Sequence, residues 1–163
     1  MLDHKREPVR KISPEFLDLF NYGVCKSLSE RLGKDAAAQV FRRAGQIEFE
    51  EMKKTSVFES REPFEVLRTV GKFLESRGYM ARIELRKVER NEVIIEMYGV
   101  SVISSSIRLT EEGASPSHIM TNLMFAALEN LCSIRADIVD LTLEKPSPES
   151  GYAKEKWILK KTD

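Results

Sequence analysis

The spacing of apolar residues divides the chain into a helical first part and a second part in which strands predominate. Apolar residues recur every three or four positions in three early segments, as they do along one side of a helix. This spacing predicts helices over residues 14–32, 34–54 and 63–77. Pro14 and Pro63 mark two of the starts, because proline is tolerated in the first helical turn. Gly33 and Gly78 are placed as stops.

Two glycines lie inside the predicted helices, where glycine costs about 1 kcal/mol relative to alanine. They are Gly23 in the first helix and Gly45 in the second. A glycine at such a position suggests that another backbone approaches closely. The first helix also carries a wide apolar side, formed by Leu17, Phe20, Val24, Leu28 and Leu32.

After Gly78 the spacing of apolar residues changes from the three- or four-residue period of a helix to the two-residue period of a strand. Tyr79, Ala81, Ile83 and Leu85 alternate with Met80, Arg82, Glu84 and Arg86, which predicts an amphipathic strand. A polar turn precedes a second strand over residues 93–100. Residues 101–109 either extend this strand or form a segment of their own. The three serines at 104–106 favour a loop or an edge strand, and the glycines of a phosphate-binding loop are absent.

A fourth helix and a second hairpin complete the predicted order of elements. Ser115-Pro116 resembles a capped helix start. The apolar face that follows consists of Met120, Leu123, Met124, Ala127, Leu128 and Leu131. Strands are expected over residues 138–144 and 153–159. In the last strand Trp157 and Leu159 should face the helices, opposite Lys154, Lys156 and Lys160.

This order predicts an α+β fold. Helices and hairpins that occur in separate runs favour a four-stranded antiparallel sheet built from two hairpins, with helices packed on one face. Residues 1–12 are polar and are expected to form a flexible arm. Residues 13–163 are expected to form a single domain, because 163 residues can bury a core without disulfides or metal.

Charge and composition exclude several classes of function. The 26 basic residues equal the 26 acidic ones, which argues against nucleic-acid binding and against electrostatic binding to anionic lipid. Zero net charge also leaves room for self-association. The sequence contains no apolar run that could span a membrane and no signal-peptide core, so a cytoplasmic protein is expected. Cys25 and Cys132 are expected to be buried free thiols.

No catalytic or metal-binding motif is present. Glu48, Glu50 and Glu51 are interpreted as a solvated helix face. Of the two histidines, His4 lies in the arm, and His118 is the best single candidate for a haem or metal ligand. One histidine without a nearby cysteine or second histidine does not make a zinc site. The identity of any cofactor is therefore left open, and catalysis is not expected.

The second half of the chain resembles the vinyl-4-reductase domain family, whose archaeal members are often described as hydrocarbon-binding proteins. The likeness covers residues 78–161, begins at Gly78-Tyr79, and includes Glu144, Gly151 and Trp157 at the spacing of a family motif. Ser147 and Glu155 replace two cysteines of that motif, and a third cysteine is absent near Ser117 or His118. The ligands of the metal or redox site that the family's cysteines suggest are therefore missing.

The resemblance implies a fold shared with small subunits of the TRAPP complex and with haem nitric-oxide-binding domains. It also implies a homodimer formed through the N-terminal helices and an apolar cavity between helices and sheet. We therefore expect a protein that binds a small hydrophobic ligand. A scaffold or regulatory subunit without a ligand is the first alternative, and a reductase or haem-dependent protein is the second. The expected ligand-binding residues are Phe41, Met97, His118, Met120, Met124 and Trp157.

Overall fold

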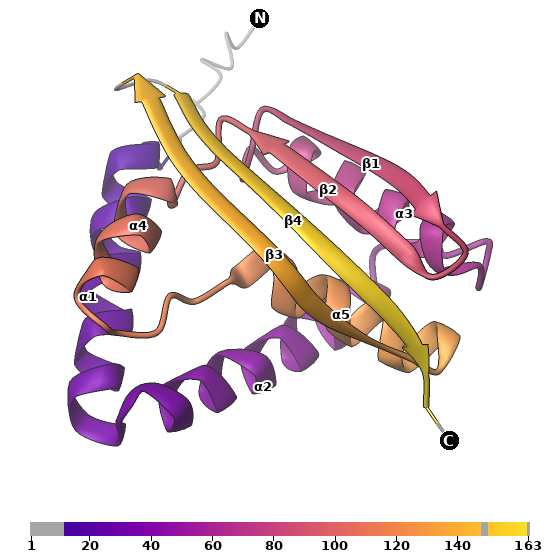
Figure 1. Ribbon diagram of the computed structural model, residues 1–163, viewed down its shortest axis with the longest axis horizontal. Coiled ribbons are helices and arrows are strands. Elements are labelled where there is room, and N and C mark those ends of the chain that lie inside the picture. The colour runs from indigo at the N-terminus through magenta and orange to yellow at the C-terminus, as the bar shows by residue number, and fades with distance from the viewer. Residues whose placement is uncertain (1–11, 148–149, 163) are drawn as a thin grey trace, which may run out of the picture.

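The computed structural model describes residues 12–147 and 150–162, so the predicted arm at 1–12 lies almost wholly outside the described residues. Within these described residues, five helices and four strands follow one another (Figure 1). The helices are α1 (Pro14–Leu32), α2 (Lys34–Lys53), α3 (Pro63–Ser76), α4 (Ile103–Glu111) and α5 (Ile119–Cys132). The strands are β1 (Arg82–Glu89), β2 (Glu92–Tyr98), β3 (Ile134–Ser147) and β4 (Ser150–Lys161). The α+β prediction is confirmed.

The four strands form one antiparallel sheet in the order β1-β2-β4-β3. Each hairpin pairs its own two strands, and β2 joins the hairpins by pairing with β4. Ile95 lies opposite Glu155, and Val93 lies opposite Trp157. The predicted join of two hairpins into one sheet is therefore correct, and the inward residues of β2 and β4 lie side by side.

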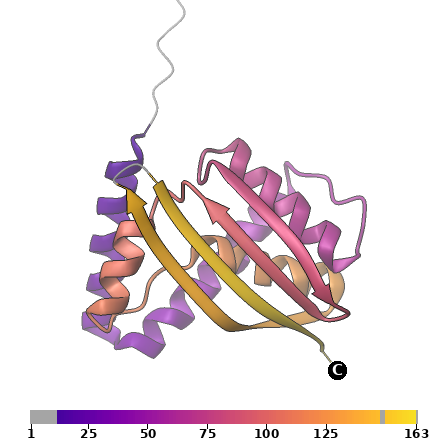
Figure 2. The same cartoon turned by 45° about the horizontal axis from the view of Figure 1, so that its top comes forward.

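Helices α3 and α5 lie behind the sheet, and α4 and α1 lie beside its β3 edge (Figures 1 and 2). Helix α3 packs on β1, and α5 packs on β3. Helix α4 packs on β3 and β4 and contacts α1, whereas α2 lies against α5 and α1. The first two helices are therefore separated from the sheet by α4 and α5.

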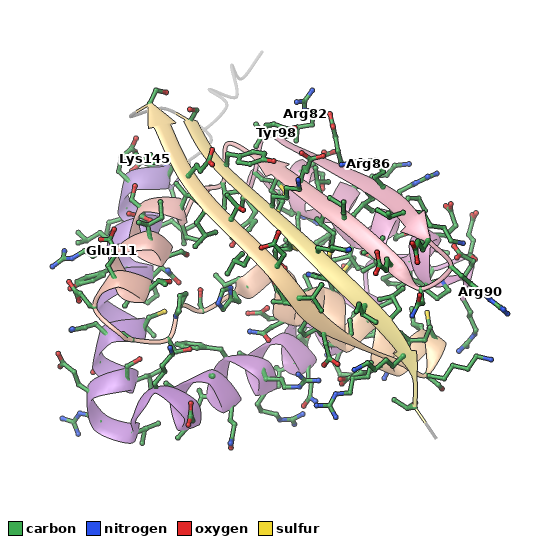
Figure 3. The ribbon with its side chains drawn as sticks, in the orientation of Figure 1. Arg82, Arg86, Arg90, Tyr98, Glu111 and Lys145 are labelled. Atoms are coloured by element: carbon green, nitrogen blue, oxygen red, sulfur yellow. The ribbon has the colours of Figure 1, made fainter. Side chains whose placement is uncertain are left out.

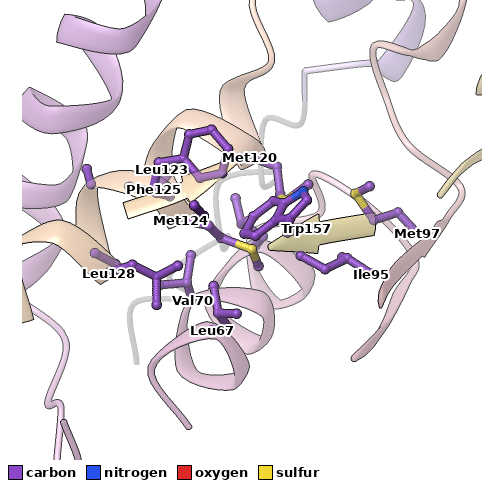
Figure 4. Packing of buried hydrophobic residues seen from close by; sticks show 14 of the residues in the cluster. Leu67, Val70, Ile95, Met97, Met120, Leu123, Met124, Phe125, Leu128 and Trp157 are labelled. Carbon is purple, nitrogen blue, oxygen red and sulfur yellow. The ribbon is translucent and has the colours of Figure 1, made fainter. Parts of the chain in front are cut away.

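The main core lies between the sheet and the layer formed by α3 and α5 (Figure 4). Trp157 is completely buried and makes an edge-to-face contact with Phe125, with ring centroids 4.8 Å apart. As predicted, Trp157 faces the helices, and the buried residues of α5 include Met120, Leu123 and Met124. Gly45 also behaves as predicted, because a Cβ built there would lie 2.6 Å from the backbone carbonyl carbon of Asn122. Helices α2 and α5 can cross this closely only because Gly45 has no side chain.

Residues 103–111 form α4, so the expectation of a loop or edge strand at the serines was wrong. Ile103, Ser106 and Leu109 are buried at the three-residue spacing of a helix face, and Ser105 is buried as well. The Ser105 hydroxyl donates to the Val102 carbonyl oxygen at 3.0 Å. This local hydrogen bond satisfies the hydroxyl of Ser105 inside a short helix.

The predicted helix start at Ser115-Pro116 was also wrong. The Ser115 amide donates to the Ser29 hydroxyl of α1 at 3.0 Å, and the Ser115 hydroxyl bonds to the carbonyl of Pro116. Helix α5 begins only at Ile119, after His118, which has a left-handed backbone with φ of 45°. The segment before the helix is therefore tied to α1 and does not cap α5.

The apolar side of α1 faces outward. Phe16, Leu19 and Phe20 are each more than half exposed, at 59%, 67% and 61%. The residues that α1 buries are Asn21 and Cys25. Gly23 lies on the open side, with no neighbouring atom within 4 Å of a built Cβ. The close backbone contact predicted for Gly23 is therefore absent from the described residues of a single chain.

Candidate functional site

The six residues predicted to bind a ligand lie in three different places. Met97, His118 and Met120 line one small cavity between the sheet, α4 and the start of α5. Met124 and Trp157 are packed completely into the core, and neither lines that cavity. Phe41 lies on α2 and lines a separate surface hollow against α1. The predicted set therefore does not form a single site.

The interior cavity is small, with a volume of about 30 Å³. A cavity of roughly 10–15 Å³ is enough for one water molecule, whereas drug-sized ligands occupy roughly 300–1,000 Å³. In this conformation the space between helices and sheet can hold a water molecule or two, but not an apolar ligand. The described residues therefore leave no apolar cavity of ligand size at this place.

Glu155, on β4, is the buried charged residue that lines this cavity, at 3% exposure. The Thr121 hydroxyl donates to its Oε1 at 2.8 Å, and the Trp157 indole nitrogen donates to its Oε2 at 2.6 Å. Burial raises the pKa of the Glu155 carboxyl, and the two hydrogen bonds oppose this effect. Sequence reasoning missed the burial of Glu155, although strand alternation places it on the same face as Trp157.

His118 precedes α5 and is partly buried at the edge of the same cavity. Burial lowers the pKa of its imidazole, which favours the neutral form. Among residues 12–147 and 150–162, no group of three His, Cys, Asp or Glu side chains is placed to hold a metal ion. His118 is therefore without the partners that a conventional protein metal site requires.

Two hollows that are larger than this cavity lie on the outer side of the helices. One, of about 480 Å³, lies between α2, α3 and the start of α5, and its walls include Ile47, Phe73 and Leu123. The other, of about 210 Å³, lies between α1 and α2 and is lined by Phe20, Phe41 and Ala44 among others. Both hollows are lined by Glu48 and Ile119, so they adjoin at these two residues. We call the two together the helical groove.

Glu48 lies in the middle of the helical groove. The residue is exposed overall, yet burial raises the pKa of its carboxyl because apolar side chains surround it. Its neighbours on α2 behave differently, since Glu50 pairs with Lys53 at 2.9 Å and Glu51 with Lys54 at 2.6 Å. Glu50 and Glu51 therefore lie on a solvated helix face, as interpreted from the sequence. Glu48 instead adds an acidic group to an otherwise largely apolar surface.

A buried polar network closes the base of the smaller hollow. The Asn21 amide nitrogen donates to the Ser105 hydroxyl at 2.8 Å, and the Ser117 hydroxyl donates to Asn21 Oδ1 at 2.7 Å. The Cys25 thiol donates to the same oxygen at 3.6 Å. Every polar atom of Asn21 is thereby satisfied, which joins α1 to α4 and to the segment before α5. Cys25 and Cys132 are both free thiols, as predicted, with Cys25 buried and Cys132 partly buried.

Comparison with solved structures finds H-NOX domains. An H-NOX point variant matches with a TM-score of 0.56 at 13% identity, over 96% of this chain and 77% of that one. An oxygen-binding H-NOX domain related to soluble guanylate cyclases, in its oxygen complex, matches with a TM-score of 0.51 at 14% identity, over 94% and 75% of the two chains. A mutant of T. tengcongensis H-NOX matches with a TM-score of 0.51 at 12% identity, over 97% and 80%.

At this level of identity the likeness shows a shared fold and no activity. The fold relation to haem nitric-oxide-binding domains, expected from the sequence, is thus supported. No protein-family model and no curated protein matches the sequence, so the resemblance to the vinyl-4-reductase domain family stays a prediction. No helix in the described part of the chain is long and apolar enough to cross a membrane.

Proposed function

We propose that this protein binds a small apolar molecule in the helical groove and does not catalyse a reaction. The observation that carries the proposal is the hollow of about 480 Å³ between α2, α3 and α5. Its volume lies within the range of roughly 300–1,000 Å³ that is usual for small-molecule sites. Its lining is mostly apolar, and the buried Met52 supplies a flexible side chain that can adapt to a ligand's shape.

Haem does not fit the residues present. One of the matched structures comes from work on haem distortion in the H-NOX family, which makes haem the first group to consider. The cavity that His118 lines is about 30 Å³, an order of magnitude below what a drug-sized ligand needs. The helical groove is large enough for a small ligand, but His118 does not line it. The proposal therefore involves no haem.

Calorimetric titration with decanol, a neutral apolar probe, tests the proposal. Binding should show a negative heat-capacity change, because apolar surface is buried. Ile47→Trp should fill the larger hollow and weaken the affinity for decanol at least tenfold, which corresponds to ~1.4 kcal/mol of binding free energy. Val40→Trp is the matched control, since Val40 lies on the same helix, is similarly exposed and lines neither hollow. If decanol does not bind, or if both variants weaken it equally, the proposed site is wrong.

Self-association through α1 is the second candidate, and it agrees with the expected homodimer. Phe16, Leu19 and Phe20 expose apolar surface on one helix, next to the open backbone at Gly23. Contiguous exposed apolar surface of this kind is typical of interaction sites. A second copy of the chain is a suitable partner, because zero net charge does not oppose association.

Sedimentation equilibrium separates the two candidates. The wild-type protein should be a dimer, and Phe20→Lys should be a monomer because a charge would be buried in the contact. Glu30→Lys is the matched control on α1, since Glu30 is exposed and polar. A wild-type monomer at high concentration would refute this second candidate and leave the ligand proposal intact.

A further inference from the structure

Another hollow lies at the far end of the sheet, separate from the helical groove. Its volume is about 380 Å³, and it is enclosed by the first turn of α3, the β1–β2 turn, and the adjacent ends of β3 and β4. We call it the end hollow. None of its lining residues lines the helical groove. Whatever binds there is therefore independent of the function proposed above.

The floor of the end hollow is apolar. Val93 is 2% exposed, and Phe64, Ile134 and Leu159 are partly buried around it. These four side chains come from α3, β2, β3 and β4, so elements of the folded core hold the floor in place. An extended apolar chain could lie on this surface and remove it from water.

The rim of the end hollow is basic. Lys87 lies near the end of β1, Arg90 in the β1–β2 turn and Lys161 at the end of β4 (Figure 3 labels Arg90). None of the three forms an ion pair with a described residue, whereas Arg82, at the other end of β1, pairs with Glu84 at 3.2 Å. The rim thus gathers three cationic groups without described partners over an apolar floor.

The two carboxylates that also line the end hollow are already engaged. Glu92 pairs with Lys156 at 2.9 Å. Glu62 caps α3, with its Oε2 accepting a hydrogen bond from the Glu65 amide at 3.0 Å. Because Glu62 occupies the end of the helix, an anion in this hollow would be recognised by side chains and not by the helix N-terminus. The three cations of the rim outnumber these two carboxylates, and none of the three forms an ion pair with either of them.

We propose that the end hollow binds an amphipathic carboxylate, with its apolar chain on the floor and its carboxylate at the basic rim. The charge of the rim selects the anionic head group, and the shape of the floor selects an acyl chain over a hydrophilic anion. Arg90 is the donor best suited by its chemistry, because a guanidinium can bind a carboxylate with two parallel hydrogen bonds. The hollow is large enough for one such ligand.

Calorimetric titration of the full chain with decanoate, below its micelle concentration, tests this inference. Decyltrimethylammonium, which has the same chain and the opposite charge, should bind at least tenfold more weakly. The variant Lys87→Gln with Arg90→Gln should lose roughly tenfold in decanoate affinity, since charge-assisted hydrogen bonds are removed. The matched control is Arg82→Gln with Arg86→Gln, which removes two exposed arginines of the same strand and leaves the rim unchanged. All four positions are exposed, so the variants should fold.

Three outcomes would overturn the inference. Equal binding of the anionic and cationic probes would show that charge does not select the ligand. Equal losses in the two double variants would show a general electrostatic effect. Loss of decanoate binding in Ile47→Trp, with the Lys87 and Arg90 variant unaffected, would place decanoate in the helical groove. The last result would support the function proposed above while refuting a site at the end hollow.

Discussion

Replacing Glu155 with glutamine should stabilise the protein at neutral pH. The carboxyl is 3% exposed and has two hydrogen-bond donors, Thr121 and Trp157, but no described cation pairs with it. Burial raises its pKa in the folded state above the value in the unfolded chain. Ionisation of Glu155 therefore opposes folding.

The sign and slope of the pH dependence of the free energy of unfolding follow from proton linkage. Below the unfolded pKa of about 4.3, Glu155 is protonated in both states and has no effect. As the pH rises from there to the folded pKa, the unfolded state loses its proton first, so the free energy of unfolding falls by about 1.4 kcal/mol per pH unit. Above the pKa that Glu155 has in the folded state, the loss in free energy of unfolding is complete and no longer changes with pH.

Glutamine can keep both hydrogen bonds of Glu155. Its amide oxygen can accept from the Trp157 indole, and its amide nitrogen can donate to the Thr121 hydroxyl, which can reverse its direction. Glu155→Gln should therefore match the wild type near pH 4 and exceed it above pH 6, as measured by urea unfolding across that range. Glu84→Gln, an exposed change on β1, is the control and should stay within about 0.5 kcal/mol of the wild type. A constant difference between Glu155→Gln and the wild type at all pH values would refute the reasoning.

Two further predictions concern the packing of the helices. Gly45→Ala should lower the free energy of unfolding by about 1–3 kcal/mol, because the added Cβ would overlap the Asn122 backbone. Gly23→Ala, studied at concentrations that favour the monomer, should instead raise the free energy of unfolding by about 0.5–1 kcal/mol. Equal effects of the two changes in urea unfolding would contradict the close crossing of α2 and α5. Asn21→Ala should lower the free energy of unfolding by about 1–3 kcal/mol, measured by thermal or urea unfolding, because Ser105 and Ser117 lose a buried hydrogen-bond partner. The control Asn130→Ala, on the exposed side of α5, should change the free energy of unfolding little.

The regular elements could be predicted because their apolar spacing is unambiguous. Ser13 and Pro14 start α1 where expected, and the Ser13 hydroxyl accepts a hydrogen bond from the Phe16 amide at 3.2 Å. Helix α4 could not be predicted, since it has nine residues and three consecutive serines, two of which have partners far away in sequence. Lys145, for example, donates to Ser104 at 2.6 Å across 41 positions.

The orientation of α1 shows a limit of periodicity. Its wide apolar side left open whether it packs within the chain or against a second copy. In the structure Asn21 and Cys25 are the buried residues, because Asn21 bonds to serines of α4 and of the segment before α5. Such a network depends on tertiary contacts that spacing does not reveal. The exposed stripe is nevertheless in keeping with the predicted association of two chains.

The candidate site was predictable only in part. Spacing correctly placed Trp157 on the inner face of the sheet, but it could not show how much space remains between the helices and the sheet. The volume depends on how α4 and α5 close over the sheet, and only about 30 Å³ is left. Glu155 could have been identified from the sequence, because it alternates with Ala153 and Trp157 along β4.

The most direct test of the proposed function is a crystal structure of the protein grown with decanol. Electron density for the alcohol should lie in the hollow between α2, α3 and α5, in contact with Ile47, Phe73 and Leu123. Density instead beside Met97 and Met120, in an enlarged interior cavity, would contradict the account and restore the site first expected from the sequence. Density at neither place, with decanol present at saturation, would also refute the proposed function.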